Sequence, residues 1–379
     1  MEHTSFDGLN LNQSLLKGVY LYGFTKPSPI QIKGIESIGS SKDCLLQSQS
    51  GTGKTATYLL GVLNRLEEND KNQCIILSPT RELALQIFSV ATELSKETKL
   101  SVINCSGGIN IRDSKSALKK ANLIIGTLGR LKHMIEDKVI SMHSIKIFVI
   151  DEADDVLADG ISDKLNFVFQ KLPTGIQTIL ISATMNPNVF TLTKKFLHDP
   201  IKILLKNSEV AVEIISQFYV EIDTEEAKLD TLLDLYGIAS TTQTIIFCNT
   251  IRKVDWLKEN LEKNNFTITV VHSKMTQEQR NEVVQEFREG KTRVLLTTDL
   301  LSRGIDIPQV NLVFNYDLPP SKETYIHRIG RCGRFGKKGV AISLIKTDDQ
   351  SDTKTLQKMK QIYKVDIREL PNDIDKYLT

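Results

Sequence analysis

A glycine-rich segment near the amino terminus has the composition of a phosphate-binding loop. Residues 48–55 read SQSGTGKT, directly after the apolar run 43–47 and before a helical pattern. Glycines let backbone N–H groups approach phosphate oxygens, and the amino terminus of the next helix favours their negative charge. Lys54 is predicted to bind the β- and γ-phosphates, and the Thr55 hydroxyl a Mg²⁺ ion. The predicted nucleotide contacts of this loop are Ser48, Gln49, Ser50, Gly51, Thr52, Gly53, Lys54 and Thr55. Taken alone, the segment also fits a helix cap with incidental glycines.

Adjacent acids follow another apolar run. The run KIFVI at 146–150 is followed by Asp151, Glu152, Ala153 and Asp154. Carboxylates in this position lie at the carboxyl edge of a sheet, where ligands bind. Asp151 can hold Mg²⁺ through its water shell, and Glu152 can orient or deprotonate an attacking water. The alternative is a solvated acidic cap of the next helix, which the upstream phosphate loop disfavours.

Both candidate sites need strands that end at one edge of a sheet. Apolar, β-branched runs recur at 43–47, 73–77, 122–126, 146–150 and 177–181, and again at 244–248, 266–271, 292–298, 310–315 and 339–345. Such continuous apolar runs are typical of strands that are buried on both faces of a parallel sheet. Amphipathic segments separate them, so the pattern predicts an α/β fold with doubly wound sheets.

The strand pattern pauses around 203–216 and then restarts. We therefore expect a first lobe at 1–205, a linker at 206–215 and a second lobe at 216–379. No further module is expected at either end.

The composition restricts the classes of partner. Hydrophobic residues make up 40% and charged residues 25% of the 379 residues, and the net charge is only +2. A nucleic-acid surface would therefore be a local groove. No run is long enough to span a membrane, and no signal peptide begins the chain. The five cysteines form no CxxC pair, which predicts buried, reduced thiols without a zinc site. We expect a reducing intracellular compartment, the cytoplasm, with the nucleus as the alternative.

Further motifs follow one another in a fixed order. Residues 23–31 read GFTKPSPIQ, residues 182–184 read SAT, and residues 327–334 read HRIGRCGR. With the phosphate loop and the DEAD segment, this series resembles the DEAD-box RNA helicases of superfamily two over essentially the whole chain. The resemblance implies two tandem RecA-like lobes, each a parallel sheet with helices on both faces.

The resemblance also implies roles for residues outside the phosphate loop. Gln31 would select ATP, because its amide offers one donor and one acceptor to adenine N6 and N7. Phe6, Lys26, Gly304 and Asp306 would also contact the nucleotide, with Asp306 on the ribose. Arg331 and Arg334 would act as arginine fingers on the γ-phosphate. The residues expected to couple hydrolysis to strand separation are Asp154, Ser182, Thr184 and Arg328. His327, which is also expected to be catalytic, and Arg328 would connect the acidic motif to the second lobe.

A further set is expected to track the RNA strand. Hydroxyls, glycine amides and arginines contact phosphate and sugar, which positions RNA without reading its sequence. By resemblance, the RNA-binding residues are Thr80, Arg81, Gly108, Thr127 and Arg130 in the first lobe, and Arg280 and Thr297 in the second.

Two positions depart from the family pattern. Leu128 stands where proline is usual, and Cys332 where glycine is common. Neither removes a charged group, so we expect activity with altered RNA affinity.

The resemblance is closest to the subgroup of eukaryotic translation initiation factor four-A. It implies an ATP-dependent RNA helicase that uses ATP and Mg²⁺, remodels RNA duplexes and RNA–protein complexes, and acts in translation initiation or mRNA metabolism. Single-stranded RNA and scaffold or initiation-factor proteins are the expected partners of a monomer that does not bind membranes. An ATP-gated RNA clamp, whose turnover partner proteins suppress, is the alternative.

Overall fold

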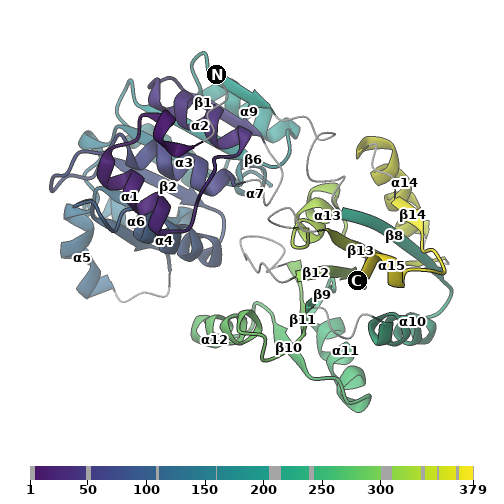
Figure 1. Ribbon diagram of the computed structural model, residues 1–379. Helices are drawn as coiled ribbons and strands as arrows, with labels where there is room; N and C mark the ends of the chain where they lie inside the picture. Colours follow the sequence, from purple (N-terminus) through teal and green to yellow (C-terminus); the bar gives the residue numbers. More distant parts are fainter. Residues whose placement is uncertain are drawn as a thin grey trace. The chain divides into compact units, whose positions relative to one another are not determined.

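The chain forms two compact units, which divide between Lys206 and Asn207. The computed structural model describes residues 5–47, 53–107, 111–158, 160–204, 215–238, 243–299, 310–333, 338–347, 350–363 and 367–378. The linker predicted at 206–215 lies outside these residues except for Ile215, which begins a strand. Figure 1 shows each unit as a sheet with helices around it.

The first unit is built on a parallel sheet of seven strands in the order β3-β4-β2-β5-β6-β1-β7. Its strands are β1 (Cys44–Gln47), β2 (Cys74–Ser78), β3 (Val102–Cys105), β4 (Leu123–Thr127), β5 (Ile147–Ile150), β6 (Gln177–Ser182) and β7 (Ile201–Leu204). The five runs predicted in this half become the five strands between the two edge strands, β3 and β7. These inner strands are almost wholly buried.

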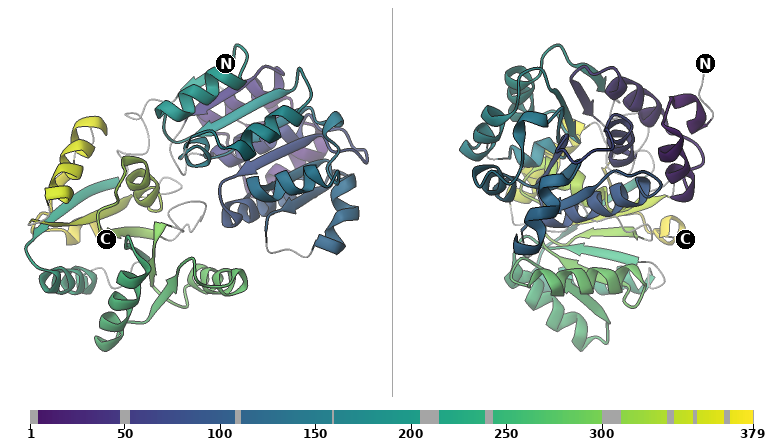
Figure 2. Two further views of the ribbon diagram at one scale, coloured as in Figure 1. Left: turned by 180° about the vertical axis from the view of Figure 1, so that it is seen from behind. Right: turned by 90° about the vertical axis from the view of Figure 1, so that its left-hand side faces the viewer.

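Helices cover both faces of this sheet (Figures 1 and 2). One face packs against α1 (Gln13–Leu21), α2 (Pro29–Gly39), α3 (Lys54–Leu63) and α4 (Arg81–Leu94). The other packs against α5 (Ile111–Lys120), α6 (Leu128–Glu136), α7 (Ala153–Val156), α8 (Asp163–Lys171) and α9 (Pro187–Phe196). Two short 3₁₀ helices, Phe6–Leu9 and Met142–Ser144, complete the described helices of this unit.

The second unit repeats this plan with the strand order β10-β11-β9-β12-β13-β8-β14, again parallel. Its strands are β8 (Ile215–Ile222), β9 (Gln243–Phe247), β10 (Ile268–Val271), β11 (Val294–Thr297), β12 (Val310–Asn315), β13 (Gly339–Lys346) and β14 (Ile367–Glu369). One face is covered by α10 (Glu225–Ile238), α11 (Ile251–Lys263) and α15 (Asp375–Leu378). The other is covered by α12 (Gln277–Arg288), α13 (Lys322–Ile329) and α14 (Gln350–Tyr363). The predicted fold class is confirmed.

The parallel arrangement decides where the motifs lie. In each unit every strand ends at the same edge of its sheet, so residues that follow neighbouring strands are brought together. In the first unit, β5, β6 and β1 are neighbours and carry the acidic, SAT and phosphate-loop segments. The adjoining strands β2, β4 and β3 carry the segments predicted to bind RNA.

All five cysteines are buried and unbridged, as predicted. Among the helices of the described residues, we find none that is both long enough and apolar enough to cross a bilayer.

Candidate active site

The phosphate side of the site begins where α3 starts. Gly53 precedes the helix with a φ of 92°, a left-handed conformation that glycine adopts without strain. Lys54 is the first residue of α3 and is only 7% exposed. Its Nζ lies 4.0 Å from Glu152 Oε2. Thr55 follows on the same turn, and the predicted contacts at 48–52 lie outside the described residues.

Gln31 packs directly against the start of α3. Ser28 and Gln31 cap α2 reciprocally: the Ser28 N–H donates to Gln31 Oε1 at 2.8 Å, and the Gln31 N–H donates to Ser28 Oγ at 3.4 Å. A Cβ atom on Gly53 would lie 3.1 Å from Gln31 Nε2, so a side chain there would crowd the amide. The amide oxygen has a second lone pair, so the cap leaves it able to accept from a base. Gln31 therefore joins the predicted adenine site to the phosphate site.

The two other predicted nucleotide residues of this segment differ in exposure. Lys26 is exposed in the turn before α2. Phe6 is 0% exposed, and its ring stacks on Phe24 at a centroid distance of 6.1 Å. The Phe6 ring thus offers no face to a ligand in this structure, contrary to the expectation of a nucleotide contact. It supports the segment from within the core.

The acidic segment has an unusual backbone at Glu152. This residue adopts φ 44° and ψ 58°, a conformation that is uncommon outside glycine and that tends to occur at functional sites. Glu152 precedes α7, but its side chain makes no capping hydrogen bond and is only 9% exposed. The alternative of a solvated helix cap therefore does not fit.

Asp151 is buried and held by two donors. Its Oδ1 accepts from the Glu152 N–H at 2.9 Å, and its Oδ2 accepts from the Tyr58 hydroxyl at 2.8 Å. Burial raises the pKa of the Asp151 carboxyl to about 7, and the charge of Glu152 adds to the rise. The Tyr58 hydrogen bond and the charge of Lys54 oppose it. The site therefore holds a carboxylate whose charge needs a nearby cation.

The SAT segment is tied to the acidic segment within the first lobe. Asp154 Oδ2 accepts from both the N–H and the hydroxyl of Thr184, at 3.1 and 2.8 Å. Ser182 ends β6, is fully buried, and donates its hydroxyl to the Thr184 carbonyl at 2.6 Å. The structure thus joins three of the residues predicted to couple hydrolysis to RNA.

The residues predicted to bind RNA lie at strand ends of the first lobe. The Thr80 hydroxyl caps α4 by accepting from the Leu83 N–H at 3.2 Å, and Arg81 beside it is exposed. A Cβ on Gly107 would lie 2.7 Å from the Arg81 guanidinium, so a larger residue there would displace that side chain. Thr127 ends β4, and Arg130 lies one turn into α6. Gly108 lies outside the described residues.

The two residues of the second lobe that are predicted to bind RNA differ in their surroundings. Arg280 lies in α12 and donates to Gln277 Oε1 at 2.9 Å. Thr297 is 0% exposed, and its hydroxyl donates to the carbonyls of Val271 and Thr298. Its side chain therefore has no surface for RNA, because it holds the end of β11 in place.

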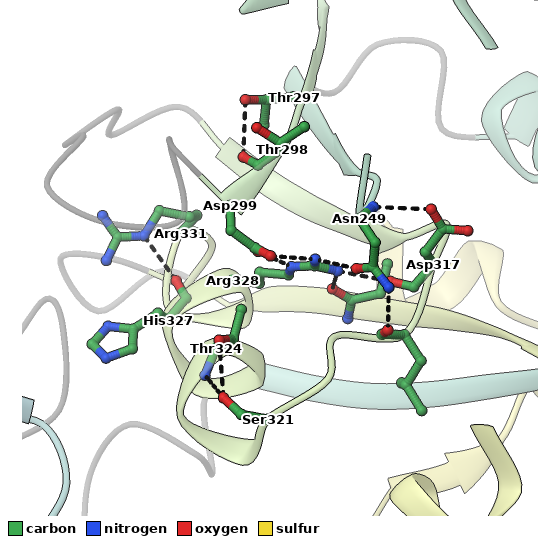
Figure 3. A network of polar contacts seen from close by, with 12 residues as sticks. Asn249, Thr297, Thr298, Asp299, Asp317, Ser321, Thr324, His327, Arg328 and Arg331 are labelled. Atoms are coloured by element: carbon green, nitrogen blue, oxygen red, sulfur yellow. Dashed lines mark hydrogen bonds and ion pairs between the residues drawn. The ribbon is translucent and has the colours of Figure 1, made fainter. Parts of the chain in front are cut away.

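Arg328 is the buried centre of a polar network at the carboxyl edge of the second sheet (Figure 3). It is 0% exposed, and its Nε and NH2 groups donate to Asp299 at 2.5 and 3.0 Å. It also donates to Asn249 Oδ1 at 2.8 Å and to the Asp317 carbonyl at 2.7 Å. The network ties together the segments that follow β9, β11 and β12.

The next turn of the chain carries the predicted catalytic residues of this lobe. Arg331 follows α13, and its Nε donates to the His327 carbonyl at 3.0 Å. Figure 3 shows the His327 ring and the Arg331 guanidinium projecting away from the Arg328 network. Gly304, Asp306 and Arg334 lie outside the described residues.

Two family models match the chain, one in each lobe. The DEAD/DEAH box helicase model matches residues 28–192, and the helicase conserved C-terminal domain model matches residues 227–336. The ATP-dependent RNA helicase eIF4A of Schizosaccharomyces pombe is 47% identical over 372 residues, which cover 98% of this chain and 94% of that protein. The chain belongs to the DEAD-box RNA helicases.

Further relatives place the helicase more closely. The eIF4A of Aspergillus fumigatus is 46% identical over 98% of this chain and 91% of its own length, which agrees with the eIF4A subgroup. The solved structure of Saccharomyces cerevisiae Dbp5 bound to RNA and ADP BeF3 matches with a TM-score of 0.92 and 36% identity, covering 99% of this chain and 98% of that one. The protein is thus an ATP-dependent RNA helicase.

Both departures from the family pattern fit the helicase fold. Leu128 is the first residue of α6 and packs against the core under that helix. Cys332 is 1% exposed, and its thiol donates to the carbonyls of Ile329 and Val340. Both side chains therefore serve packing.

The structure corrects the role predicted for Arg328. We expected it to connect the acidic motif of the first lobe to the second lobe. Its described donors are instead used inside the second lobe, on Asp299, Asn249 and Asp317. Because the guanidinium is fully buried there, we assign Arg328 to holding the edge of its own sheet.

Replacing Arg328 with methionine should destabilise the second lobe. The free energy of unfolding should fall by about 2–4 kcal/mol, somewhat less than the usual cost of removing one partner of a buried ion pair, because Asp299 is partly exposed. The only tryptophan, Trp256 in α11, reports on this lobe by fluorescence during urea unfolding.

The exposed Arg252 on the same helix provides the control. Its substitution by methionine should change the free energy by no more than about 0.5 kcal/mol. If Arg328→Met unfolds like the wild type yet loses RNA-dependent turnover, the coupling role originally predicted is restored.

Two residues of these networks, Tyr58 and Asp299, belong to none of the motifs recognised in the sequence. Tyr58 lies four residues after Lys54, on the same side of α3, and this spacing was the available signal. Asp299 follows β11 as Asp151 follows β5, so its position at a strand end could have indicated it.

Proposed function

We propose that the helicase is an RNA-stimulated ATPase that separates short RNA duplexes by closing its two lobes on one strand. The observation that carries this proposal is that the predicted catalytic residues are divided between the two lobes. Lys54, Asp151 and Glu152 gather on the first lobe, whereas Arg331 is carried by the second. RNA that binds both lobes would then favour the state in which all four act on one nucleotide.

The acidic end of β5 fits a hydrated Mg²⁺ ion. Mg²⁺ is usually bound through one or two carboxylates, several waters and the substrate phosphates. Asp151 would hold it together with the Thr55 hydroxyl. Glu152 Oε2 is buried and has no hydrogen-bond partner among the described residues, which leaves it available to a water. When bound, the ion neutralises charge on the β- and γ-phosphate oxygens.

The residues of the chain supply the remaining steps of hydrolysis. Lys54 binds the phosphates, and Gln31 holds adenine beside Gly53. Glu152 orients the attacking water and accepts its proton, because its buried carboxylate lies 4.0 Å from Lys54, the residue that binds the β- and γ-phosphates. Arg331, with Arg334, stabilises the charge that develops on the transferred phosphoryl group. Asp306 contacts the ribose, and Gly304 contributes to the nucleotide site.

We propose that the hydrogen bonds between Asp154 and Thr184 pass the state of the nucleotide site to the RNA site. They join the segments that end β5 and β6, and β5 lies beside β2, which carries Thr80 and Arg81. The backbone around Thr297, with Arg280, provides the contacts of the second lobe. All of these groups suit phosphate and sugar, so binding is independent of sequence.

The identity to eIF4A proteins supports a role in translation initiation, with scaffold or initiation-factor proteins as partners in the cytoplasm. The solved structure of Dbp5 bound to RNA supports RNA as the ligand.

Strand separation of a short fluorescent RNA duplex tests this function. We expect separation with ATP and Mg²⁺, little with a non-hydrolysable ATP analogue, and equal rates for unrelated duplex sequences of the same stability. Affinity for single strands should fall with salt, with a slope of ~0.7 per neutralised phosphate. Retention of RNA with ATP but without strand separation or turnover would favour the clamp instead. Tight, salt-independent binding of one sequence would contradict both functions.

A further inference from the structure

Tyr58 contacts the acidic segment although it belongs to none of the recognised motifs. It lies in α3, four residues after Lys54, and is 0% exposed. Its ring packs in the core between the sheet and α1–α4, and its hydroxyl donates to Asp151 Oδ2 at 2.8 Å. A buried hydroxyl needs a hydrogen-bond partner, and the partner of this one is Asp151 of the acidic segment. The geometry therefore places the hydroxyl where it acts on Asp151.

The hydrogen bond from Tyr58 is one of two that fix the orientation of the Asp151 carboxylate. Asp151 Oδ1 accepts from the Glu152 N–H, and Oδ2 accepts from Tyr58, so each oxygen is held by a donor from a different element. An ionised carboxylate has about four lone-pair sites, and these two donors leave the others for further ligands. The carboxylate plane is thus set before any ligand arrives.

We propose that Tyr58 is a positioning residue that orients the Asp151 carboxylate toward a hydrated divalent cation and thereby sets the affinity for that cation. Mg²⁺ demands near-ideal octahedral geometry, so a carboxylate that is free to turn binds its water shell less well. Partners that orient a metal-binding carboxylate typically contribute 10–100-fold in metal affinity. The inference rests on the proposed Mg²⁺ site and adds to it a residue that touches neither the cation nor the nucleotide.

The variant Tyr58→Phe tests this role, because it keeps the ring and removes only the hydroxyl. Mn²⁺ is titrated into the full chain in the presence of ADP, and bound Mn²⁺ is followed by electron paramagnetic resonance. The dissociation constant for Mn²⁺ should rise about 10-fold, at the low end of the range for such partners. ATP turnover should fall more at limiting than at saturating Mg²⁺.

Tyr316→Phe provides a matched control. Tyr316 is also 0% exposed and donates to a carboxylate, Glu225 Oε1, at 3.0 Å, but it lies in the second lobe after β12. Its substitution should lower the midpoint of unfolding and leave the Mn²⁺ dissociation constant within about 2-fold of the wild type, since no nucleotide residue is touched.

The outcomes separate this inference from the function on which it rests. If Tyr58→Phe unfolds earlier but binds Mn²⁺ like the wild type, the hydrogen bond is structural only and the inference is wrong. An equal loss of Mn²⁺ affinity in Tyr316→Phe would also overturn it. Failure of the wild type itself to bind Mn²⁺ with ADP would overturn the proposed cation site together with this role.

Discussion

Replacement of Arg331 with alanine should reduce RNA-stimulated ATP turnover at least ~100-fold. An arginine that stabilises the transferring phosphoryl group is typically worth ~10³–10⁵ in rate, and the lower figure is a cautious fraction of that range. Arg331 is anchored through its Nε to the His327 carbonyl, so its guanidinium is held by the turn that follows α13. The same loss is expected for Arg334→Ala.

ATP binding without RNA should change little in the Arg331 variant, because most of the proposed nucleotide contacts lie on the first lobe. Steady-state turnover at saturating RNA is therefore measured beside nucleotide affinity without RNA. Arg252→Ala, on an exposed side of α11, should behave like the wild type in both. Normal hydrolysis by both Arg331→Ala and Arg334→Ala would show that the second lobe does not complete the active site.

Replacement of Lys54 with alanine should abolish measurable ATP turnover. Loss of one preorganised group that stabilises developing charge costs ~10²–10³ in rate, and weaker phosphate binding adds to this loss. Lys54 Nζ also lies 4.0 Å from Glu152 Oε2, so its removal takes this cation away from a buried acid. Unlike Arg331→Ala, the variant should bind ATP poorly even without RNA.

The exposed Lys33 on α2 is the control for Lys54. Lys33→Ala removes the same charge from the first lobe and should retain turnover within about 2-fold, because a solvated lysine is screened from the phosphates. Wild-type turnover by Lys54→Ala would remove the phosphate loop from the mechanism.

In the first sheet the five inner strands could be predicted from sequence and the two edge strands could not. In the second sheet the edge strand β10 was also predicted, whereas the inner strand β8 and the edge strand β14 were not. Strands such as β5 are buried on both faces and therefore appear as uninterrupted apolar runs. The edge strand β7 buries little, and β8, beside the edge strand β14, mixes buried and half-exposed residues. The sequences of β7 and β8 resemble those of loops, because strands that are only partly buried contain no continuous run of apolar residues.

The positions of site residues were predictable where a residue type has a fixed spacing, as at Lys54, which begins α3, and Asp151, which follows β5. The use of a side chain was not predictable where tertiary contacts decide it. Arg328 stands in a motif of arginines, yet its guanidinium is buried on Asp299 within its own lobe. Thr297 is similar, because its hydroxyl is taken by the Val271 carbonyl. Tyr58 was missed because its partner, Asp151, lies far away in sequence and meets it only when α3 packs on the sheet.

The most direct test of the account is ATP turnover by the full chain across a titration of single-stranded RNA. The account holds that RNA assembles the catalytic groups of the two lobes on one nucleotide. Turnover should therefore rise at least ~10-fold with RNA and then saturate. This rise is a small part of the ~10³–10⁵-fold rate effect of an arginine finger. DNA of the same sequence should stimulate far less, if 2′-hydroxyls are contacted. Equal turnover with and without RNA would contradict the account.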